Sequence, residues 1–226
     1  MLKLDFASIL QRWPLFLDGL VLTFELSAIA TLLGFIVGTL SAVGRRSGLT
    51  WISRLCGAYV EVIRNTPLLV QVFLVYFGFS SIGLSLSAFV VALVALTINV
   101  GAYTTEIMRA GFDSIHKGQI EAAECLGLTR RQVYWHVILL PAMERVYPAL
   151  TSQFVALMLA TSIVSQISAE ELTAVANHVQ SDTFRPFETF ILVGALYMVL
   201  SLVMRLSFWG LGTLLFPRRH RLGTPM

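Results

Sequence analysis

A few polar side chains stand inside long apolar stretches of this sequence. Asn99 and Tyr103 are one helical turn apart, and Gln153 and Ser162 belong to a later apolar stretch. Such groups can line a pathway and hydrogen-bond the carboxylate and amine of a polar solute, or they can satisfy one another between helices. Both interpretations stay open. The residues predicted to contact a solute are Asn99, Tyr103, Gln153, Met158, Thr161 and Ser162.

Covalent catalysis has no comparable set of candidates. The sequence contains no H-E-x-x-H, no G-x-S-x-G and no phosphate-binding G-x-x-x-x-G-K-[ST]. The four histidines are scattered, and Cys56 and Cys125 lack the spacing of a metal or redox pair. We therefore expect no catalytic residue, no metal and no cofactor in this chain.

The positions of the charged residues predict the elements that must hold these polar groups. Of the 226 residues, 56% are hydrophobic and 13% are charged, whereas soluble domains carry about a quarter charged residues. Charges are missing from four runs: 26–44, 65–105, 146–169 and 189–204. Because a helix needs about 20 apolar residues to cross a bilayer, we predict an all-α integral membrane protein with five transmembrane helices in a single domain, 1–226. Their approximate ranges are 18–43, 66–82, 86–108, 146–168 and 187–215.

The basic residues predict the orientation of these helices. With the amino terminus outside and the carboxyl terminus in the cytoplasm, 13 of the 16 Lys and Arg residues lie on the cytoplasmic side. The reverse orientation would place those 13 outside. The excess of basic residues is thus explained by the membrane topology. Because these residues are spread over several loops, we expect no nucleic-acid partner.

The segment 109–145 is the long polar stretch between two predicted membrane helices. Residues 119–126 predict a short helix, and Gly127 fits the left-handed residue that ends it. Thr129 then begins a second short helix with a capping box, which Pro141 is expected to close. A structured cytoplasmic element of this kind favours docking of a soluble partner.

This segment and several others resemble one family, the permease subunits of ATP-binding-cassette (ABC) importers. The segments similar to the EAA loop of those permeases are Glu121–Ala123, Gly127 and Ile138–Pro141. The segments similar to polar amino acid permeases, of histidine and glutamine type, are Arg64–Gln71, Gly101–Tyr103, Arg109–Gly111, Lys117–Gln119, Thr161–Ser162 and Glu171–Thr173. Together these motifs run in order from about residue 19 to residue 219.

The resemblance implies a type I importer permease fold in a bacterial plasma membrane. It implies two ABC ATPase subunits that bind ATP and Mg, a second permease (the same chain or a paralogue), and an extracytoplasmic amino-acid-binding protein. The loop 115–141 would couple to the ATPases. Its implied coupling residues are Glu121, Ala122, Ala123, Gly127, Leu128 and Pro141.

Two observations limit the implied function. Many relatives have Lys-Asp or Lys-Ser where this chain has Leu159-Ala160, so we do not expect this subunit alone to recognise a cationic amino acid. A secondary transporter or a channel is the alternative function, and an intramembrane enzyme is a third. A secondary transporter would need an ionisable relay deep in the membrane, and the centres of the predicted helices contain none.

Overall fold

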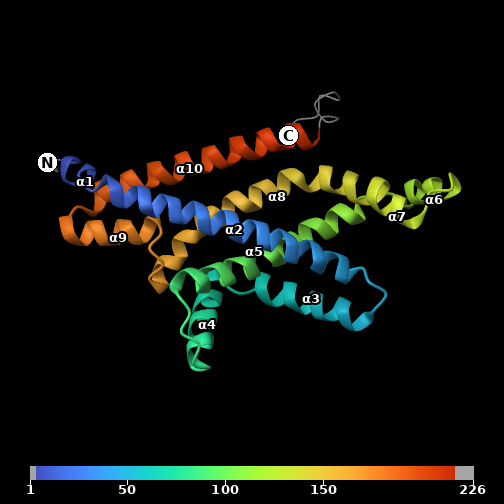
Figure 1. Ribbon diagram of the computed structural model, residues 1–226, viewed down its shortest axis with the longest axis horizontal. Coiled ribbons are helices and arrows are strands. Elements are labelled where there is room, and N and C mark those ends of the chain that lie inside the picture. Colours follow the sequence, from blue (N-terminus) through green and yellow to red (C-terminus); the bar gives the residue numbers. More distant parts are fainter. Residues whose placement is uncertain (1–3, 217–226) are drawn as a thin grey trace.

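The protein forms an elongated bundle of helices in the computed structural model, which describes residues 4–216. The long helices run along one direction, with the amino-terminal end and the α6–α7 region at opposite ends (Figure 1). The elements in chain order are α1 (Ala7–Leu10), α2 (Trp13–Arg45), α3 (Thr50–Arg64), α4 (Leu68–Ser81), α5 (Ala88–Asp113), α6 (Lys117–Cys125), α7 (Arg130–Gln132), the π-helix η1 (Val133–Leu139), α8 (Leu140–Ala160), the 3₁₀-helix η2 (Thr161–Ile167), α9 (Leu172–Thr183) and α10 (Pro186–Leu215).

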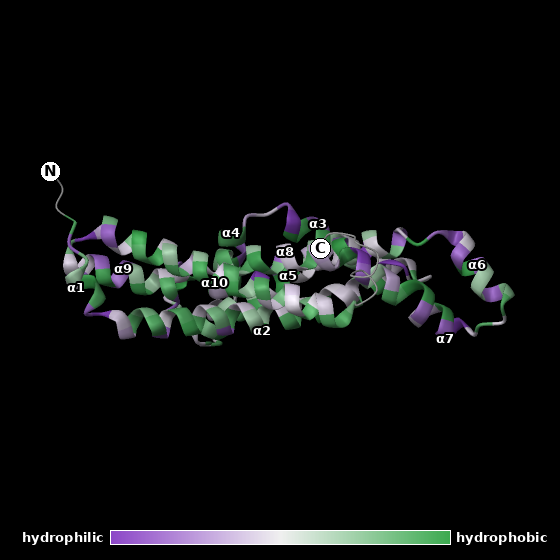
Figure 2. Cartoon of the chain, turned by 90° about the horizontal axis from the view of Figure 1, so that it is seen from above, coloured by the Kyte–Doolittle hydropathy of each residue, from purple (hydrophilic) through white to green (hydrophobic). Residues whose placement is uncertain are grey.

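Five membrane crossings follow from these helices if one of them is a broken span. In the part of the chain that is described, α2, α5, the run Arg130–Ile167 and α10 are each long and apolar enough to cross a bilayer. The pair α3 and α4, bent by 111° at its break, supplies the fifth. Hydrophobic residues dominate the middle of the bundle, and hydrophilic residues gather toward both ends (Figure 2).

The second crossing differs from its predicted form, a helix over 66–82. Helix α4 has 14 residues, or about 21 Å at 1.5 Å per residue, which is less than the hydrocarbon thickness of about 30 Å. It lies across the direction of the long helices (Figure 1), and α3 completes the span. The break falls at the extended residue Pro67, because the residue before a proline is biased away from helical geometry.

Close packing of α2 against α5 forms the centre of the bundle. A Cβ atom added at Gly34 would lie 2.1 Å from a methyl group of Val100, and one added at Gly38 would lie 2.5 Å from Thr104. Glycine at these two positions lets the helix backbones approach each other. The small-residue face of α2 is therefore an internal packing surface of this chain.

The fourth crossing continues without a break into the polar segment 109–145, so the prediction that Pro141 closes a separate short helix was wrong. Pro141 lies at the start of α8, directly after the π-helix η1. Proline has no N–H to donate and its ring crowds the preceding turn. The wider turns of η1 precede Pro141 and the helix continues through it, as π-helical turns do when they are inserted into α-helices.

Candidate functional site

The predicted coupling loop folds into a compact helical element, which we call the knob (residues 117–132). Gly127 ends α6 with φ of +78°. Its N–H donates to the Glu124 carbonyl over 2.9 Å, and the Leu128 N–H donates to the Ala123 carbonyl over 3.2 Å. These two bonds form a Schellman motif. The predicted left-handed turn at Gly127 is confirmed.

The second half of the knob begins with the predicted capping box. The Gln132 N–H donates to the Thr129 hydroxyl over 3.4 Å, and the Thr129 N–H donates to the Gln132 side chain over 2.9 Å. Reciprocal bonds of this kind satisfy donors that a helix amino terminus otherwise leaves free. The two motifs together fix the path of the chain between α6 and α7.

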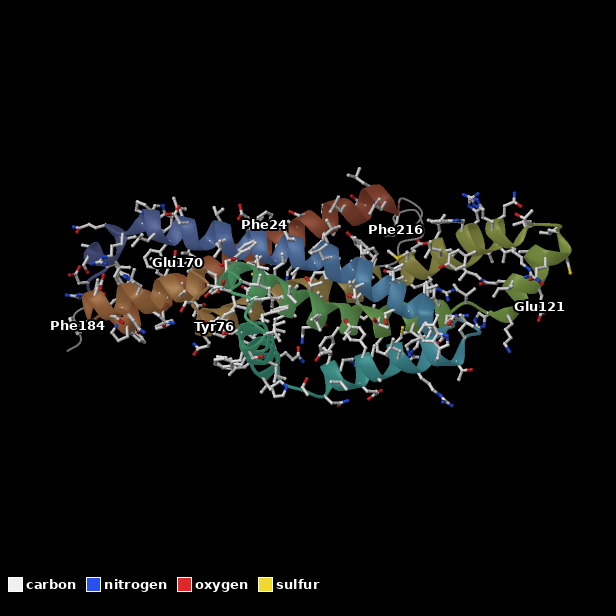
Figure 3. All side chains as sticks on the ribbon, turned by 60° about the horizontal axis from the view of Figure 1, so that its bottom comes forward. Phe24, Tyr76, Glu121, Glu170, Phe184 and Phe216 are labelled. Atoms are coloured by element: carbon white, nitrogen blue, oxygen red, sulfur yellow. The ribbon has the colours of Figure 1, made fainter. Side chains whose placement is uncertain are left out.

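The surface of the knob has a groove of about 500 Å³ between α6 and the run η1–α8. Four of the predicted coupling residues line it: Ala122, Ala123, Leu128 and Pro141. Glu121 is exposed at the far end of the molecule (Figure 3), and Gly127 forms the turn beside the groove. Leu126 also lines the groove and is 80% exposed. Its signal in the sequence is an apolar residue directly before the turn glycine.

The two membrane helices that flank the knob are joined to each other near its base. Arg145 of α8 donates to the carbonyl oxygen of Ser114 and, over 3.0 Å, to the Ser114 hydroxyl. A Cβ atom added at Gly111 of α5 would lie 2.5 Å from a methyl group of Val146. A displacement of the knob would therefore be transmitted to both α5 and α8.

The predicted pathway residue Asn99 is engaged in a network at the bend between α3 and α4. Its amide donates to the Gln71 side-chain oxygen over 2.9 Å. The Gln71 amide donates in turn to the Ile63 carbonyl over 2.7 Å, to the Thr66 carbonyl over 3.0 Å and to the Thr66 hydroxyl over 2.9 Å. Gln71 satisfies backbone groups that the broken helix exposes, which is a requirement at membrane depth.

The predicted pathway residue Tyr103 lies beside a cluster of charged residues at the meeting of α2, α3 and α5. The Arg64 guanidinium carbon lies 5.4 Å from the centroid of the Tyr103 ring. Glu106 forms ion pairs with Arg45 and, over 2.8 Å, with Arg109. Arg64 ends α3, about 22 Å along a 15-residue helix from its first residue. Its guanidinium nevertheless lies 4.0 Å from Glu106, which also pairs with Arg45 at the end of α2.

The predicted pathway residues of α8 and η2 have other surroundings. Met158 has no exposed surface and packs in a cluster with Leu200 and Met204 of α10. Thr161 is also fully buried, and its hydroxyl donates to the Met158 carbonyl over 2.7 Å. Gln153 and Ser162 are half-buried. Among residues 4–216, none of these four side chains hydrogen-bonds to Asn99 or Tyr103.

A buried carboxylate stabilises the end of the bundle opposite the knob. Glu171 is fully buried and accepts bonds from the N–H groups of Thr173 and Ala174, each over 2.9 Å, and from the Tyr197 hydroxyl over 2.6 Å. Burial raises the pKa of the Glu171 carboxyl. The side chain caps α9 and joins it to α10, so it is not a solvated surface group, whereas Glu170 at the same end is exposed (Figure 3).

The knob, the apolar helices and the absence of an ATP-binding loop agree with the comparisons with known proteins. The family described as the binding-protein-dependent transport system inner membrane component matches residues 30–218. The chain belongs to this family. It is a multi-pass inner-membrane permease subunit of an ABC importer, and ATP is hydrolysed in separate ATPase subunits. The alternatives of a secondary transporter, a channel or an enzyme are thereby set aside.

Named relatives of this permease cover nearly its whole length. It is 34% identical over 221 residues to the nopaline transport permease NocM of Agrobacterium fabrum, covering 91% of this chain and 92% of the relative. It is 37% identical over 197 residues to the probable glutamine ABC transporter permease GlnM of Bacillus subtilis, covering 87% and 91%. With the glutamine permease GlnP of Escherichia coli K12 it shares 34% identity over 206 residues, covering 90% and 94%.

Solved structures confirm the type I importer permease fold. A chain of an amino acid ABC transporter crystallised with histidines superposes with a TM-score of 0.85 at 37% identity, covering 96% of this permease and 100% of that chain. A chain of the methionine transporter MetNI superposes with a TM-score of 0.75 at 19% identity, covering 91% and 98%. The second likeness concerns the fold alone. The predicted all-α fold of a type I importer permease is thus confirmed, with four or five candidate membrane spans among the described residues.

Proposed function

We propose that this permease carries a polar amino acid, delivered by an extracytoplasmic binding protein, through a pathway shared with a second permease. Two ATPase subunits, which bind ATP and Mg, would each receive one knob. The printed names of the relatives support the substrate class, since they carry nopaline, glutamine, arginine or cystine. The chain 1–226 acts as one transmembrane domain in this assembly.

The observation that carries the coupling role is the knob with its exposed groove. A groove with apolar residues at the polar end of a membrane protein favours a protein partner. The helical run from Arg130 through η1 into α8 gives the partner a direct mechanical connection to the membrane. Closure of the ATPases on ATP would move the knob, tilt α5 and α8, and open the pathway to the outer side.

Replacing Leu126 by Asp tests the docking role with little effect on the fold, because the side chain is 80% exposed. The matched control is Phe184→Asp, which changes an 88% exposed apolar side chain at the opposite end of the molecule. We expect the partner ATPase subunit to co-purify with the Phe184→Asp variant and to be lost from the Leu126→Asp variant. Equal co-purification with both variants would remove the knob from the ATPase interface.

The orientation of the proposed assembly has its own test. We propose that the amino terminus lies outside and the knob lies in the cytoplasm, as 13 of 16 basic residues favour. After replacement of Cys56 and Cys125, a cysteine at Ser181 should react with an impermeant thiol reagent in intact cells, and one at Gly118 should not. The opposite pattern would reverse the topology.

The proposed pathway includes the six polar or polarisable residues on α5, α8 and η2. Tyr103, Gln153 and Ser162 are half-buried, which supports contact with a solute, and Asn99 is buried but keeps 8% of its surface exposed. Met158 and Thr161 have none, so their contact with a solute requires repacking in another transport state. Alanine substitution of the four accessible residues should lower the amount of amino acid imported per ATP hydrolysed. Unchanged import for all four variants would place the pathway elsewhere.

A further inference from the structure

Arg64 carries a guanidinium group whose hydrogen-bonding capacity is unused. Its side chain is 43% exposed, and its nearest carboxylate oxygen, on Glu106, is 4.0 Å away. Within residues 4–216, no side-chain hydrogen bond of Arg64 meets normal distance limits. The Tyr103 ring covers the group at 5.4 Å, which is within the range of a cation–π contact. Arg64 is therefore held in place while its five N–H donors stay available.

The neighbouring acidic residues cannot neutralise Arg64. Glu106 already pairs with Arg45 and Arg109, and Asp113 pairs with Arg46 over 3.1 Å and with Arg109 over 2.9 Å. Four arginines, Arg64 included, thus share two carboxylates, which leaves a net charge of two positive units in the cluster. An anion approaching Arg64 meets a favourable potential.

Among the described residues, Arg64 has one long ion pair, with Glu106, which leaves most of its charge uncompensated. It directly precedes the charge-free run 65–105, and its guanidinium extends to Glu106, beside Arg45 at the end of α2. Ionisable residues at membrane depth usually pair with another group or mark a solute pathway. Tyr103, whose ring lies against the Arg64 guanidinium, belongs to the pathway proposed above, so Arg64 adjoins that pathway.

We propose that Arg64 binds the α-carboxylate of the transported amino acid. The planar guanidinium matches a carboxylate with two parallel N–H···O bonds. The Tyr103 ring orients the guanidinium plane, and Glu106 holds it from the other side. This inference rests on the proposed function, since it assigns one contact within the amino acid pathway.

The competing explanation is purely structural: the positive charge of Arg64 holds α3 against α5 and does not contact the solute. We call this role the latch. Lysine separates the two roles, because it keeps the charge beside Glu106 and Tyr103 but loses the planar fork. Arg54 provides the matched control, since it is an exposed arginine on the same helix with no ion pair among the described residues. The test therefore compares Arg64→Lys and Arg64→Gln with Arg54→Lys and Arg54→Gln.

The experiment uses the complete complex in lipid nanodiscs and proteoliposomes. Radiolabelled L-glutamine is the first probe, followed by L-arginine and L-cystine, and the competitor is the corresponding amino acid amide, which lacks the carboxylate. Failure of the wild-type complex to import any of these amino acids would refute the proposed function itself. For each amino acid that is imported, its Kd for the complex is measured in the absence of the binding protein. The number of amino acid molecules imported per ATP hydrolysed is then measured in the presence of the binding protein.

We expect Arg64→Lys to weaken amino acid binding about 10- to 100-fold, the range for a lost charge-assisted pair, with an unchanged melting temperature. The amide should compete weakly with the wild type and equally weakly with the variant, and the Arg54 variants should behave as wild type. Tyr103→Leu should weaken binding, and Tyr103→Phe should restore it. Wild-type Kd and import per ATP in both Arg64 variants would overturn the proposal. A normal Arg64→Lys variant combined with an unstable Arg64→Gln variant would also overturn it and establish the latch.

Discussion

Replacement of Gly127 by alanine would isolate the contribution of one turn to the coupling of this permease. The added methyl group would meet no atom within 4 Å, so it creates no steric clash. The residue nevertheless has φ of +78°, and a left-handed conformation costs a non-glycine residue about 1–2 kcal/mol. The closed turn would lose a factor of about 5–30 in population relative to open forms.

Opening of this turn breaks the two hydrogen bonds that position α6 on α7. We therefore expect Gly127→Ala to leave the membrane bundle folded while the groove between α6 and η1 becomes mobile. The complex should hydrolyse ATP with a weaker response to the loaded binding protein. Gly127→Asp should act in the same direction through the same backbone strain, with an added charge at the proposed ATPase contact.

Two controls separate backbone strain from other effects. Gly118→Ala changes a glycine in the same element, where an added Cβ also meets nothing within 4 Å and φ is not positive. Gly127→Asn introduces a larger side chain of a type that tolerates left-handed geometry. Both variants should keep the response to the binding protein. If Gly127→Ala keeps wild-type stimulation of ATP hydrolysis and uptake, a rigid turn in the knob is not needed for coupling.

Three further predictions concern the membrane bundle. Gly38→Ala should lower the melting temperature by the equivalent of about 1–3 kcal/mol, because its Cβ would lie 2.5 Å from Thr104, whereas Gly78→Ala, in open space, should not. Gln71→Leu should cost about 1–3 kcal/mol by leaving buried polar groups unpaired at the α3–α4 bend, and a wild-type melting temperature would refute that role. The pKa of Glu171 is raised in the folded state, so the folded protein binds this proton more tightly than the unfolded chain does. The resulting contribution to the free energy of unfolding is complete below the ordinary pKa of 4.5 and should be lost as the pH rises through the raised pKa. Melting temperatures measured across that pH range should show this decline for the wild type and not for Glu171→Gln.

The features that could be predicted from the sequence are those set by local residue patterns. The charge-free runs predict the long helices, because uncharged apolar length is what a bilayer requires. Gly127 and Thr129 predict the knob, since positive φ and amino-terminal capping each favour few residue types. Five of the six predicted coupling residues lie in the knob for the same reason, because they are within a few turns of one another, and Pro141 lies at the start of α8.

The features that the sequence did not reveal depend on contacts between distant segments. Burial of Met158 and Thr161 depends on which face of α8 meets α10, and periodicity does not identify the neighbour of a helix that is apolar on most sides. The contacts of Arg64 with Tyr103 and Glu106 could not be predicted, because nothing local shows that α3 packs along α5. Glu171 resembles a solvated loop residue until α10 supplies Tyr197.

The continuity of the fourth crossing gives the coupling proposal its mechanical basis. If Pro141 ended a separate helix, motion of the knob would be absorbed by a flexible joint at the membrane surface. Instead, helical structure extends from Arg130 to Ala160, and Arg145 joins that run to the end of α5. Because Tyr103 lies on α5 and Gln153 on α8, a single displacement of the knob would move both helices that contribute polar groups to the proposed pathway. In this proposal the groups that bind the solute and the helices that respond to ATP belong to the same elements, so access to the solute would change whenever the ATPases moved the knob.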